Sequence, residues 1–402
     1  MPHLPLVTDL PLVTDDDALD WAADDFGHVV RGRPVGVLRA TRADDVVAAV
    51  RFGRARGLAV VPRAEGHSTG GQAQAPGGVV LDLRGLAAVH EVTSERVVVD
   101  AGARWRDVLT ATAALGATPP VLTDYLDLSV GGTLSVGGIG GASHHFGAQT
   151  DNVLELDAVT PDGTRVTCSP TRHRELFDAL RAGRGRHGVI VRATLRLAPA
   201  PTHARCFRLR YDSLADFLHD QRVLVRERRF DHLEGRARPD GAGRWAFRVD
   251  GVAHFTGSPP DERLLVGLRD RRSAAEVCTS TYRRFANRMA DDVAQLRALG
   301  PWGRPHPWLT VLLPDDAAEA VLAGTFAELT PEAIGGTGVV LVYPLARDRF
   351  RTPALRLPDS PVSFLLGLLR TADSAAALSG ALAHNRVVRR RALAAGGVHY
   401  LP

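Results

Sequence analysis

The sequence of 402 residues contains no lysine, so all 49 of its basic residues are arginine. A P-loop needs a lysine on the phosphates of its nucleotide, and pyridoxal phosphate enzymes need a lysine that forms an imine. Both classes of enzyme are therefore excluded.

Cysteine and long apolar segments are scarce as well. Cys168, Cys206 and Cys278 lie far apart in the sequence and form no CxxC pair, which favours a reducing, cytoplasmic location. No apolar run approaches the roughly 20 residues of a membrane span, and the segment from Met1 to Asp17 lacks the basic cluster of a signal peptide. We expect a cytoplasmic protein without a membrane partner.

Concentrated charge and metal-binding patterns are also missing. The net charge is +4, with both signs mixed along the chain, and the longest basic cluster, residues 386–391, is interrupted by valines. We therefore predict that the protein does not bind nucleic acid. HExxH and paired CxxC motifs do not occur, and the adjacent His144 and His145 are expected to point apart. We predict no metal site.

The hydrophobic periodicity predicts an α+β protein with two domains, residues 1–199 and 200–402, divided where Pro199 and Pro201 interrupt the chain. In the first domain, residues 36–62 are typical of strand, helix and strand, with Thr41 as a helix cap and Gly57 at the helix end. Further strands are predicted in this domain at 79–83, 97–100, 153–160, 164–168 and 189–197. Further helices are predicted at 105–115 and 176–180.

The second domain mixes strands and helices without regular βαβ alternation. Its predicted strands are 206–211, 245–252, 309–313 and 339–343. Its predicted helices lie near 214–228, 260–272 and 315–328.

The segment of residues 66–80 places His67 between Gly66 and Ser68 and continues with further glycines. Glycines tolerate positive φ and lack a Cβ, so their backbone amides can close on an anionic or planar ligand. A histidine in that setting is held exposed at a tight turn. There it either meets a ligand or caps its own loop.

The segment of residues 131–147 is the second glycine-rich stretch. The GxGxxG register fails at Ser143 and no compact βαβ unit surrounds the segment, so it is not a Rossmann fingerprint. Two interpretations stay open: a flexible loop, and a phosphate cradle of backbone amides to which Thr133 and Ser135 add hydroxyl donors.

Together, the two segments resemble the PCMH-type FAD-binding domain of the vanillyl-alcohol oxidase superfamily. In members with this GHS turn, the histidine is joined covalently to the flavin 8-methyl group, which by position implies His67 here. The segment 183–190 is similar to the adenine-side segment of the superfamily. The resemblance implies these cofactor-binding residues: Gly66, His67, Ser68, Gln72, Asp124, Thr133, Ser135, Gly137, Gly138, Ile190 and Tyr400.

Five ordered motifs are similar, more narrowly, to cytokinin dehydrogenases, and they span nearly the whole chain. They are GHSxxGQAxAPGGVV at 66–80, TDYL at 123–126 before SVGGTLS at 129–135, PHPWL at 305–309, YPL at 343–345 and HYLP at 399–402. DHLEG at 231–235 is a looser sixth match. The fold implied is an FAD-binding domain followed by a cap domain made of an antiparallel sheet and helices.

The resemblance implies that Asp124 and Glu234 are the catalytic carboxylates. In the family, the aspartate of TDYL accepts a proton from the substrate amine, and a second acidic residue hydrogen-bonds the adenine-like ring. A carboxylate beside the nitrogen would also stabilise the cation left by hydride loss. From the residues alone, Asp124 could instead be a loop aspartate that caps Tyr125, and Glu234 could be a solvated glutamate on a strand. The implied substrate pocket consists of Glu234, Trp308, Thr310, Tyr343 and Leu401. Trp308 could instead be a tryptophan of the core. His306, which lies between two prolines, is expected to be structural.

The sequence departs from the family at four places. Thr310 stands where the family commonly has asparagine, Arg186-His187 replaces Gln-Phe, and His144-His145 replaces Phe-Arg. The family also continues beyond the HYLP motif with a helix and a Pro-Gly segment that reaches the flavin, whereas this sequence ends at Pro402. Truncation, a substitute element and an open flavin edge are all compatible with that end.

Three functions remain in competition. The leading hypothesis is an FAD-dependent oxidoreductase that cleaves the N6 side chain of a cytokinin-type adenine into adenine and an aldehyde, passing electrons to dioxygen or a quinone. The second, favoured by Thr310, is an oxidase of an alcohol, sugar or natural-product amine. The third is a flavin-binding protein without turnover. A monomer or weak dimer is expected.

Overall fold

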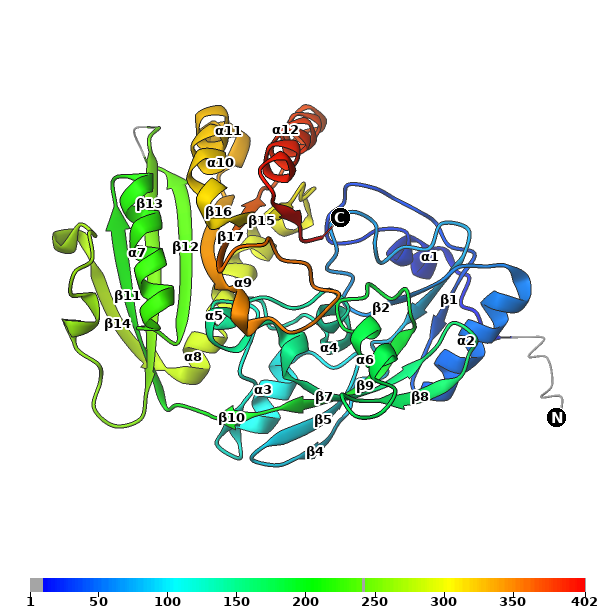
Figure 1. Ribbon diagram of the computed structural model, residues 1–402. Coiled ribbons are helices and arrows are strands. Elements are labelled where there is room, and N and C mark those ends of the chain that lie inside the picture. Colours follow the sequence, from blue (N-terminus) through cyan, green and yellow to red (C-terminus); the bar gives the residue numbers. More distant parts are fainter. Residues whose placement is uncertain (1–9, 241–242, 402) are drawn as a thin grey trace.

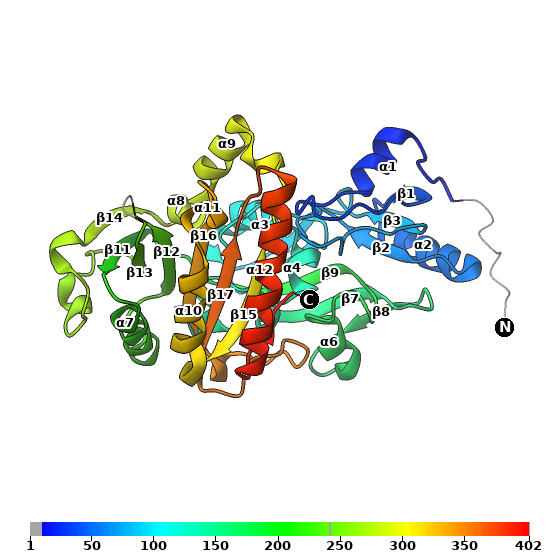
Figure 2. The same cartoon turned by 90° about the horizontal axis from the view of Figure 1, so that it is seen from above.

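The computed structural model describes residues 10–240 and 243–401 and confirms the mixed α+β composition. Two small sheets and a five-stranded sheet are formed by residues that precede Pro201, and an eight-stranded sheet is formed by residues that follow it (Figure 1). The two halves lie side by side, with the eight-stranded sheet at one end and helix α2 near the other (Figures 1 and 2).

The first half contains a parallel three-stranded sheet and an antiparallel five-stranded sheet. The order of the first is β1-β3-β2, and the order of the second is β4-β5-β9-β7-β8. A two-stranded sheet pairs β10 with β6. The strand bounds are β1 Gly36–Arg39, β2 Val60–Arg63, β3 Val79–Asp82, β4 Val89–Val92, β5 Arg96–Asp100, β6 Ala117–Thr118, β7 Val153–Val159, β8 Arg165–Cys168, β9 Val189–Arg196 and β10 Ala198–Pro199.

The predicted strand–helix–strand unit at residues 36–62 is confirmed as β1, α2 and β2. Helix α2 begins after Arg42 rather than Thr41, because the carboxylate of Asp45 accepts hydrogen bonds from the N–H groups of both residues. It ends at Gly57, which adopts a left-handed φ of 65°. The strands predicted at 153–160 and 164–168 are also confirmed, as β7 and β8, which form an antiparallel hairpin.

The eight-stranded sheet has the order β14-β11-β13-β12-β16-β17-β15-β18, and all its strand pairs are antiparallel. It brings Cys206 directly opposite Cys278, although they are distant in the sequence. The strand bounds are β11 His203–Tyr211, β12 His232–Pro239, β13 Trp245–Phe255, β14 Glu276–Thr281, β15 Leu309–Pro314, β16 Val339–Ala346, β17 Val362–Leu369 and β18 Val398–His399.

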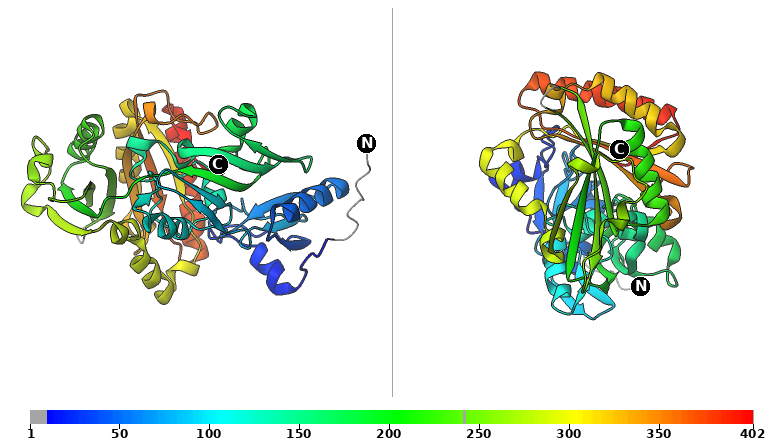
Figure 3. Two further views of the ribbon diagram at one scale, coloured as in Figure 1. Left: turned by 90° about the horizontal axis from the view of Figure 1, so that it is seen from below. Right: turned by 90° about the vertical axis from the view of Figure 1, so that its left-hand side faces the viewer.

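Helices α7, α10 and α12 cover one face of this sheet, as Figure 2 and the right-hand view of Figure 3 show. Their apolar side chains and the inward face of the sheet form the largest core cluster. The opposite face contacts α5 of the first half. The helix bounds are α1 Asp16–Ala22, α2 Ala43–Arg56, α3 Trp105–Ala113, α4 Val130–Leu134, α5 Ser143–Phe146, α6 Arg174–Leu180, α7 Leu214–Glu227, α8 Tyr282–Ala286, α9 Met289–Leu299, α10 Asp315–Glu328, α11 Pro331–Ile334 and α12 Ala375–Ala394.

The helix predicted near residues 260–272 is wrong. Only two short 3₁₀ turns form there, Glu262–Leu265 and Arg272–Ala274. Gly267 lies between them with a φ of 78°, which a continuous right-handed helix does not allow. The guanidinium of Arg272 donates to the carbonyl of Leu265, which holds the segment folded back.

Among the helices of the described residues, none has both the length and the apolar character of a transmembrane segment.

Candidate active site

The turn that contains His67 is held in place by a buried aspartate. Asp25 accepts hydrogen bonds from the hydroxyl of Ser68 at 2.8 Å and from the N–H of Gly71 at 2.7 Å. The backbone is pinned as well, because the N–H of Phe26 donates to the carbonyl of Gly66. Gly66 has a φ of 63°, and a Cβ added there would meet the Arg63 guanidinium at 2.5 Å. The chain therefore fixes the direction in which His67 points.

An Asp25→Ala variant is expected to lose about 1–3 kcal/mol of unfolding free energy, because buried N–H and O–H donors are left without an acceptor. Urea unfolding followed by circular dichroism measures the loss. Asp20→Ala is the matched control, since Asp20 is exposed and its carboxylate bonds to the exposed Arg33. Equal stability of the two variants would contradict the role given to Asp25.

His67 lies in a cluster of rings that both halves of the chain supply. Its imidazole stacks on Phe26, with ring centroids 3.9 Å apart, and lies 5.0 Å from the ring of Tyr125. From the second half, Trp302 and Trp308 lie 5.9 and 6.0 Å from it. Burial, followed by the nearby charges of His306 and Arg297, lowers the pKa of His67 to about 3. At neutral pH the imidazole is therefore uncharged and keeps a nucleophilic nitrogen.

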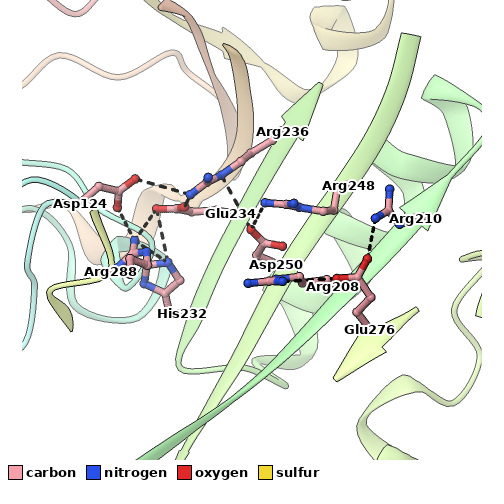
Figure 4. Close-up of polar contacts among 10 residues, drawn as sticks. All are labelled: Asp124, Arg208, Arg210, His232, Glu234, Arg236, Arg248, Asp250, Glu276 and Arg288. Carbon is pink, nitrogen blue, oxygen red and sulfur yellow. Dashed lines mark hydrogen bonds and ion pairs between the residues drawn. The ribbon is translucent and has the colours of Figure 1, made fainter. Parts of the chain in front are cut away.

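Asp124 is the residue before Tyr125, and its carboxylate lies near Arg236 and Glu234 of strand β12. It forms an ion pair with Arg288. The same guanidinium nitrogen, Nη2, lies 3.2 Å from Oε1 of Glu234 and 3.3 Å from Nε2 of His232 (Figure 4). The structure thus brings the two predicted carboxylates together, with one nitrogen between them.

The two carboxylates titrate differently: Glu234 is buried, whereas Asp124 is half-buried, with a side chain that is 28% exposed. Burial raises the pKa of Asp124 to about 7, opposed by the charge of Arg288 and supported by that of Glu234. Burial also disfavours the charge on Glu234, but the charges of Arg288, His232 and Arg236 outweigh it and hold the pKa of Glu234 well below its ordinary value. One carboxylate is therefore permanently ionised and the other exchanges a proton near neutral pH, which is typical of catalytic pairs.

Asp124, His232 and Glu234 also have the composition of a metal site, because their ligand atoms lie within 4.8 Å of one another. Sequence motifs gave no indication of this grouping. In the structure, Nη2 of Arg288 contacts all three side chains and supplies the positive charge that a metal would bring. The absence of a metal stays a prediction.

The glycine-rich segment begins with one helical turn and continues mainly as turns and loop. Residues Val130–Leu134 form helix α4, and the hydroxyls of Thr133 and Ser135 donate to the carbonyls of Val130 and Gly131. In this conformation helix carbonyls accept the hydrogens of these hydroxyls, and the use of Thr133 and Ser135 as phosphate donors stays a prediction. Gly138, with a φ of 75°, donates its N–H to the hydroxyl of Tyr400 at 3.1 Å.

Other predicted residues have varied surroundings. Gln72 accepts the N–H of Gly70 within its own turn, and Ile190 is buried in the core of the first half. Tyr343 is buried, and burial together with the charges of Glu234 and Asp124 raises its pKa. Leu401 is 40% exposed. The carbonyl of Thr310 accepts the N–H of Tyr400, which joins strand β15 to the end of the described chain.

Trp308 and the adjacent pair His144 and His145 also have defined partners. The indole N–H of Trp308 donates to the carbonyl of Arg370 at 3.1 Å, which turns its ring toward Phe26 and His67. The expectation that His144 and His145 point apart is wrong: their rings lie 4.2 Å apart, because both bond to the carbonyl of Phe230.

The residues around His67 fit a planar, anionic cofactor such as FAD. Within the described part of the chain, the N–H groups of residues 66–69 donate no hydrogen bond. Unpaired amides at a glycine turn form a concavity for anionic groups, and the neutral imidazole beside them offers a nitrogen for bond formation. FAD contributes both kinds of partner, an anionic pyrophosphate and an electrophilic ring system.

Sequence reasoning missed Asp25, Phe26, Arg236, Arg288 and Trp302. None of them belongs to a recognisable motif, and each approaches the site only through tertiary folding. Arg288 is 164 residues from Asp124 along the chain.

Two family models match the chain. One, described as an FAD binding domain, matches residues 34–169. The other, described as cytokinin dehydrogenase 1, FAD and cytokinin binding, matches residues 262–399. Together with the observed sheets, these matches confirm the predicted FAD-binding domain and the following sheet-and-helix domain.

Similar proteins cover nearly the whole chain. The "uncharacterized oxidoreductase ORF5 in fasciation locus" of Rhodococcoides fascians is 43% identical over 96% of this chain and 88% of its own. Cytokinin dehydrogenase 10 of Oryza sativa is 36% identical over 89% of this chain and 74% of its own, and cytokinin dehydrogenase 4 of Arabidopsis thaliana is 31% identical over 92% and 80%.

Among solved structures, 6-hydroxy-D-nicotine oxidase from Arthrobacter nicotinovorans resembles this fold. The TM-score is 0.76, and the alignment covers 99% of this chain and 88% of the other. The identity is 22%, so the similarity concerns the fold alone.

Proposed function

Because the chain belongs to the cytokinin dehydrogenase family and is an FAD-dependent oxidoreductase, we propose that it cleaves the N6 side chain of a cytokinin-type adenine. One observation supports this proposal above the others. A single N–H donor, Nη2 of Arg288, bridges Asp124 and Glu234, so the space between these carboxylates already accommodates a nitrogen. The proposed substrate would present its amine N–H to Asp124 and a ring N–H to Glu234.

Each carboxylate has a separate task in the proposed reaction. Asp124, with its pKa near 7, takes the proton of the amine nitrogen while the neighbouring carbon loses hydride. Glu234, permanently ionised, accepts a ring N–H and fixes the orientation of the adenine. Bound FAD supplies the two-electron acceptor. The resulting imine is hydrolysed by water to adenine and an aldehyde.

Arg288 must leave Asp124 for the amine to bind. Its guanidinium also lies over the ring of Phe285, 4.7 Å from the ring centroid, so it has another contact when Asp124 is taken. The proposed substrate therefore exchanges one N–H donor for another without leaving a carboxylate unpaired.

We also propose that FAD is attached covalently through His67. The support is the neutral imidazole, the unpaired amides of residues 66–69 and the rigid turn that Asp25 holds. Dioxygen or a quinone is the proposed electron acceptor.

An anaerobic substrate screen tests the proposed function. N6-isopentenyladenine is expected to bleach the flavin absorbance and to yield adenine and an aldehyde, whereas alditols and simple alcohols leave the absorbance unchanged. Bleaching by an alcohol or sugar but not by the adenine would replace the proposal with an alcohol oxidase. Bleaching by none of the compounds would indicate a flavin-binding protein without turnover.

A further inference from the structure

Two cysteines that are distant in the sequence are neighbours in the eight-stranded sheet. Strands β11 and β14 lie side by side at one end of this sheet (Figure 1), and their antiparallel pairing places Cys206 directly opposite Cys278. Both are free cysteines. The pairing is regular from His203 and Thr281 to Arg208 and Glu276, with two matched residue pairs on the near side of the cysteines and three on the far side. The register, and not a local motif, therefore brings the two thiols together.

The separation that this register imposes fits a disulfide. Directly opposed residues of antiparallel strands have Cα atoms about 4.5–5.5 Å apart, and their side chains project from the same face of the sheet. Disulfides usually join residues whose Cα atoms are about 4.4–6.8 Å apart. The two side chains already interact: burial, followed by the charge of Asp250 and the contact with Cys278, raises the pKa of Cys206 to about 12. The sulfurs can therefore bond through side-chain rotation alone.

The surroundings of the two thiols give them different parts in such a reaction. Cys278 is exposed, so an oxidant in solution reaches it, whereas Cys206 is half-buried and keeps its proton at neutral pH. Burial opposes the charge on Arg208, but negative charge on Cys206 or Cys278 raises its pKa, which places this cation beside both sulfurs. Negative charge that develops on Cys278 as it attacks an oxidant is therefore stabilised. Cys278 reacts first, and Cys206 completes the bond.

Strand β14 is the strand that such a bond would secure. It is the edge strand of the sheet, and five of its six residues are exposed. Its side chains are tied to β11 by ion pairs of Glu276 with Arg210 at 2.6 Å and with Arg208 at 3.3 Å. Exposed ion pairs contribute little to stability, and an edge strand lacks a second neighbour. The chain runs on from β14 through α8 to Arg288, the partner of Asp124.

We propose that Cys206 and Cys278 are a modification site at which hydrogen peroxide forms a reversible disulfide that joins strand β14 to strand β11. The thiolate of Cys278 attacks one peroxide oxygen, breaks the O–O bond and becomes a sulfenic acid as hydroxide leaves. The sulfur of Cys206 then attacks the sulfur of Cys278, and water leaves. In total, two thiols and one peroxide give one disulfide and two waters, and the two electrons pass from sulfur to oxygen. A soluble dithiol reverses the reaction by exchange.

Thiol counting and peptide mapping test the assignment without any substrate, so their outcome is independent of the proposed function. The purified protein is treated with hydrogen peroxide, unfolded in denaturant and titrated with a thiol reagent. The three thiols of the chain should fall to one and return to three after dithiothreitol. Digestion after arginine under non-reducing, acidic conditions should yield peptide 206–208 linked to peptide 273–283. Three thiols after peroxide, or thiol loss that dithiothreitol does not reverse, would overturn the proposal.

Two serine variants locate the reaction. Cys278→Ser, at an exposed position, should keep both of its remaining thiols after peroxide. Cys168→Ser is the matched control and should lose both of its remaining thiols, because Cys168 is buried on strand β8 with its sulfur 3.6 Å from the carbonyl oxygen of Leu156. Covalent dimers on a non-reducing gel, in place of the linked peptides, would show that Cys278 pairs between molecules and would overturn the cross-strand assignment.

Thermal unfolding followed by circular dichroism tests whether the bond secures the strand. The peroxide-treated protein should unfold at a temperature roughly 2–8 °C above that of the reduced protein, because a bond between residues 206 and 278 closes a long loop and restricts the unfolded chain. Cys278→Ser given the same treatment should show no rise, which separates the disulfide from oxidation of other residues. Linked peptides without a rise in the unfolding temperature would overturn the securing role of the disulfide.

Discussion

An Asp124→Asn variant is expected to undergo flavin reduction by substrate about 10²–10⁴-fold more slowly than the unaltered protein while retaining bound FAD. Asparagine preserves the size of the side chain but cannot take a proton from the substrate amine. It also removes the negative charge that stabilises the cation formed as hydride departs. Anaerobic stopped-flow measurement of flavin absorbance gives the rate directly.

The pH profile of the same reaction adds a second test. Because the pKa of Asp124 is raised to about 7, the fraction of ionised carboxylate increases as the pH rises through neutrality. The reduction rate of the unaltered protein should therefore rise with pH across that range and fall below it, where the carboxyl is protonated. The Asp124→Asn variant should lack this rise.

Asp127→Asn is the matched control, since Asp127 lies on the same segment but pairs with Arg106. It should reduce at close to the unaltered rate. Glu234→Gln should act mainly on KM, because the glutamate orients the ring rather than moving a proton. An unaltered rate in Asp124→Asn would remove this residue from the chemistry.

Local signals in the sequence predicted the first half of the fold well. The unit at residues 36–62 has a capped helix, a glycine that ends it and short apolar strands on either side, so neighbouring residues specify its structure. The hairpin at Pro161-Asp162-Gly163 is similarly local. The helix predicted near residues 260–272 does not form. The spacing of apolar residues there is helical, but Gly267 has a positive φ and Arg272 bonds back to the carbonyl of Leu265, and the spacing reveals neither effect. Strands β12 and β17 and helix α12 were not anticipated.

The residues of the candidate site also fall into two groups, those that sequence motifs reveal and those that only the tertiary structure brings together. His67, Asp124 and Glu234 were found because they belong to motifs, and the structure places Tyr125 beside His67 and Glu234 near Asp124. The arginines were not found, because in a chain whose basic residues are all arginine no single one stands out. Only the strand register reveals that Arg236, Arg248 and Arg210 lie in one row. The hydroxyls of Thr133 and Ser135 bond to carbonyls of their own helix, a local contact that the motif did not reveal, and their role toward a cofactor stays a prediction.

A His67→Ala variant is expected to lose all covalently bound flavin, so that its acid-precipitated protein is colourless while that of the unaltered protein stays yellow. The reason is the state of the imidazole. Burial lowers the pKa of His67 to about 3, which leaves a nucleophilic nitrogen at neutral pH, and the stacked ring of Phe26 restricts its orientation. Alanine removes that nitrogen but leaves the glycine turn and the bonds to Asp25 in place.

His306→Ala is the control for this loss, because His306 stacks on Phe26 at 4.2 Å but belongs to the second half of the chain. It should leave the precipitate yellow. A native absorbance spectrum of His67→Ala distinguishes a lost bond from a lost cofactor. Since the unpaired amides of residues 66–69 remain, FAD should still bind noncovalently and be released when the protein is denatured. A yellow precipitate from His67→Ala would place the linkage on another residue, and the uncharged imidazole would then need a different explanation.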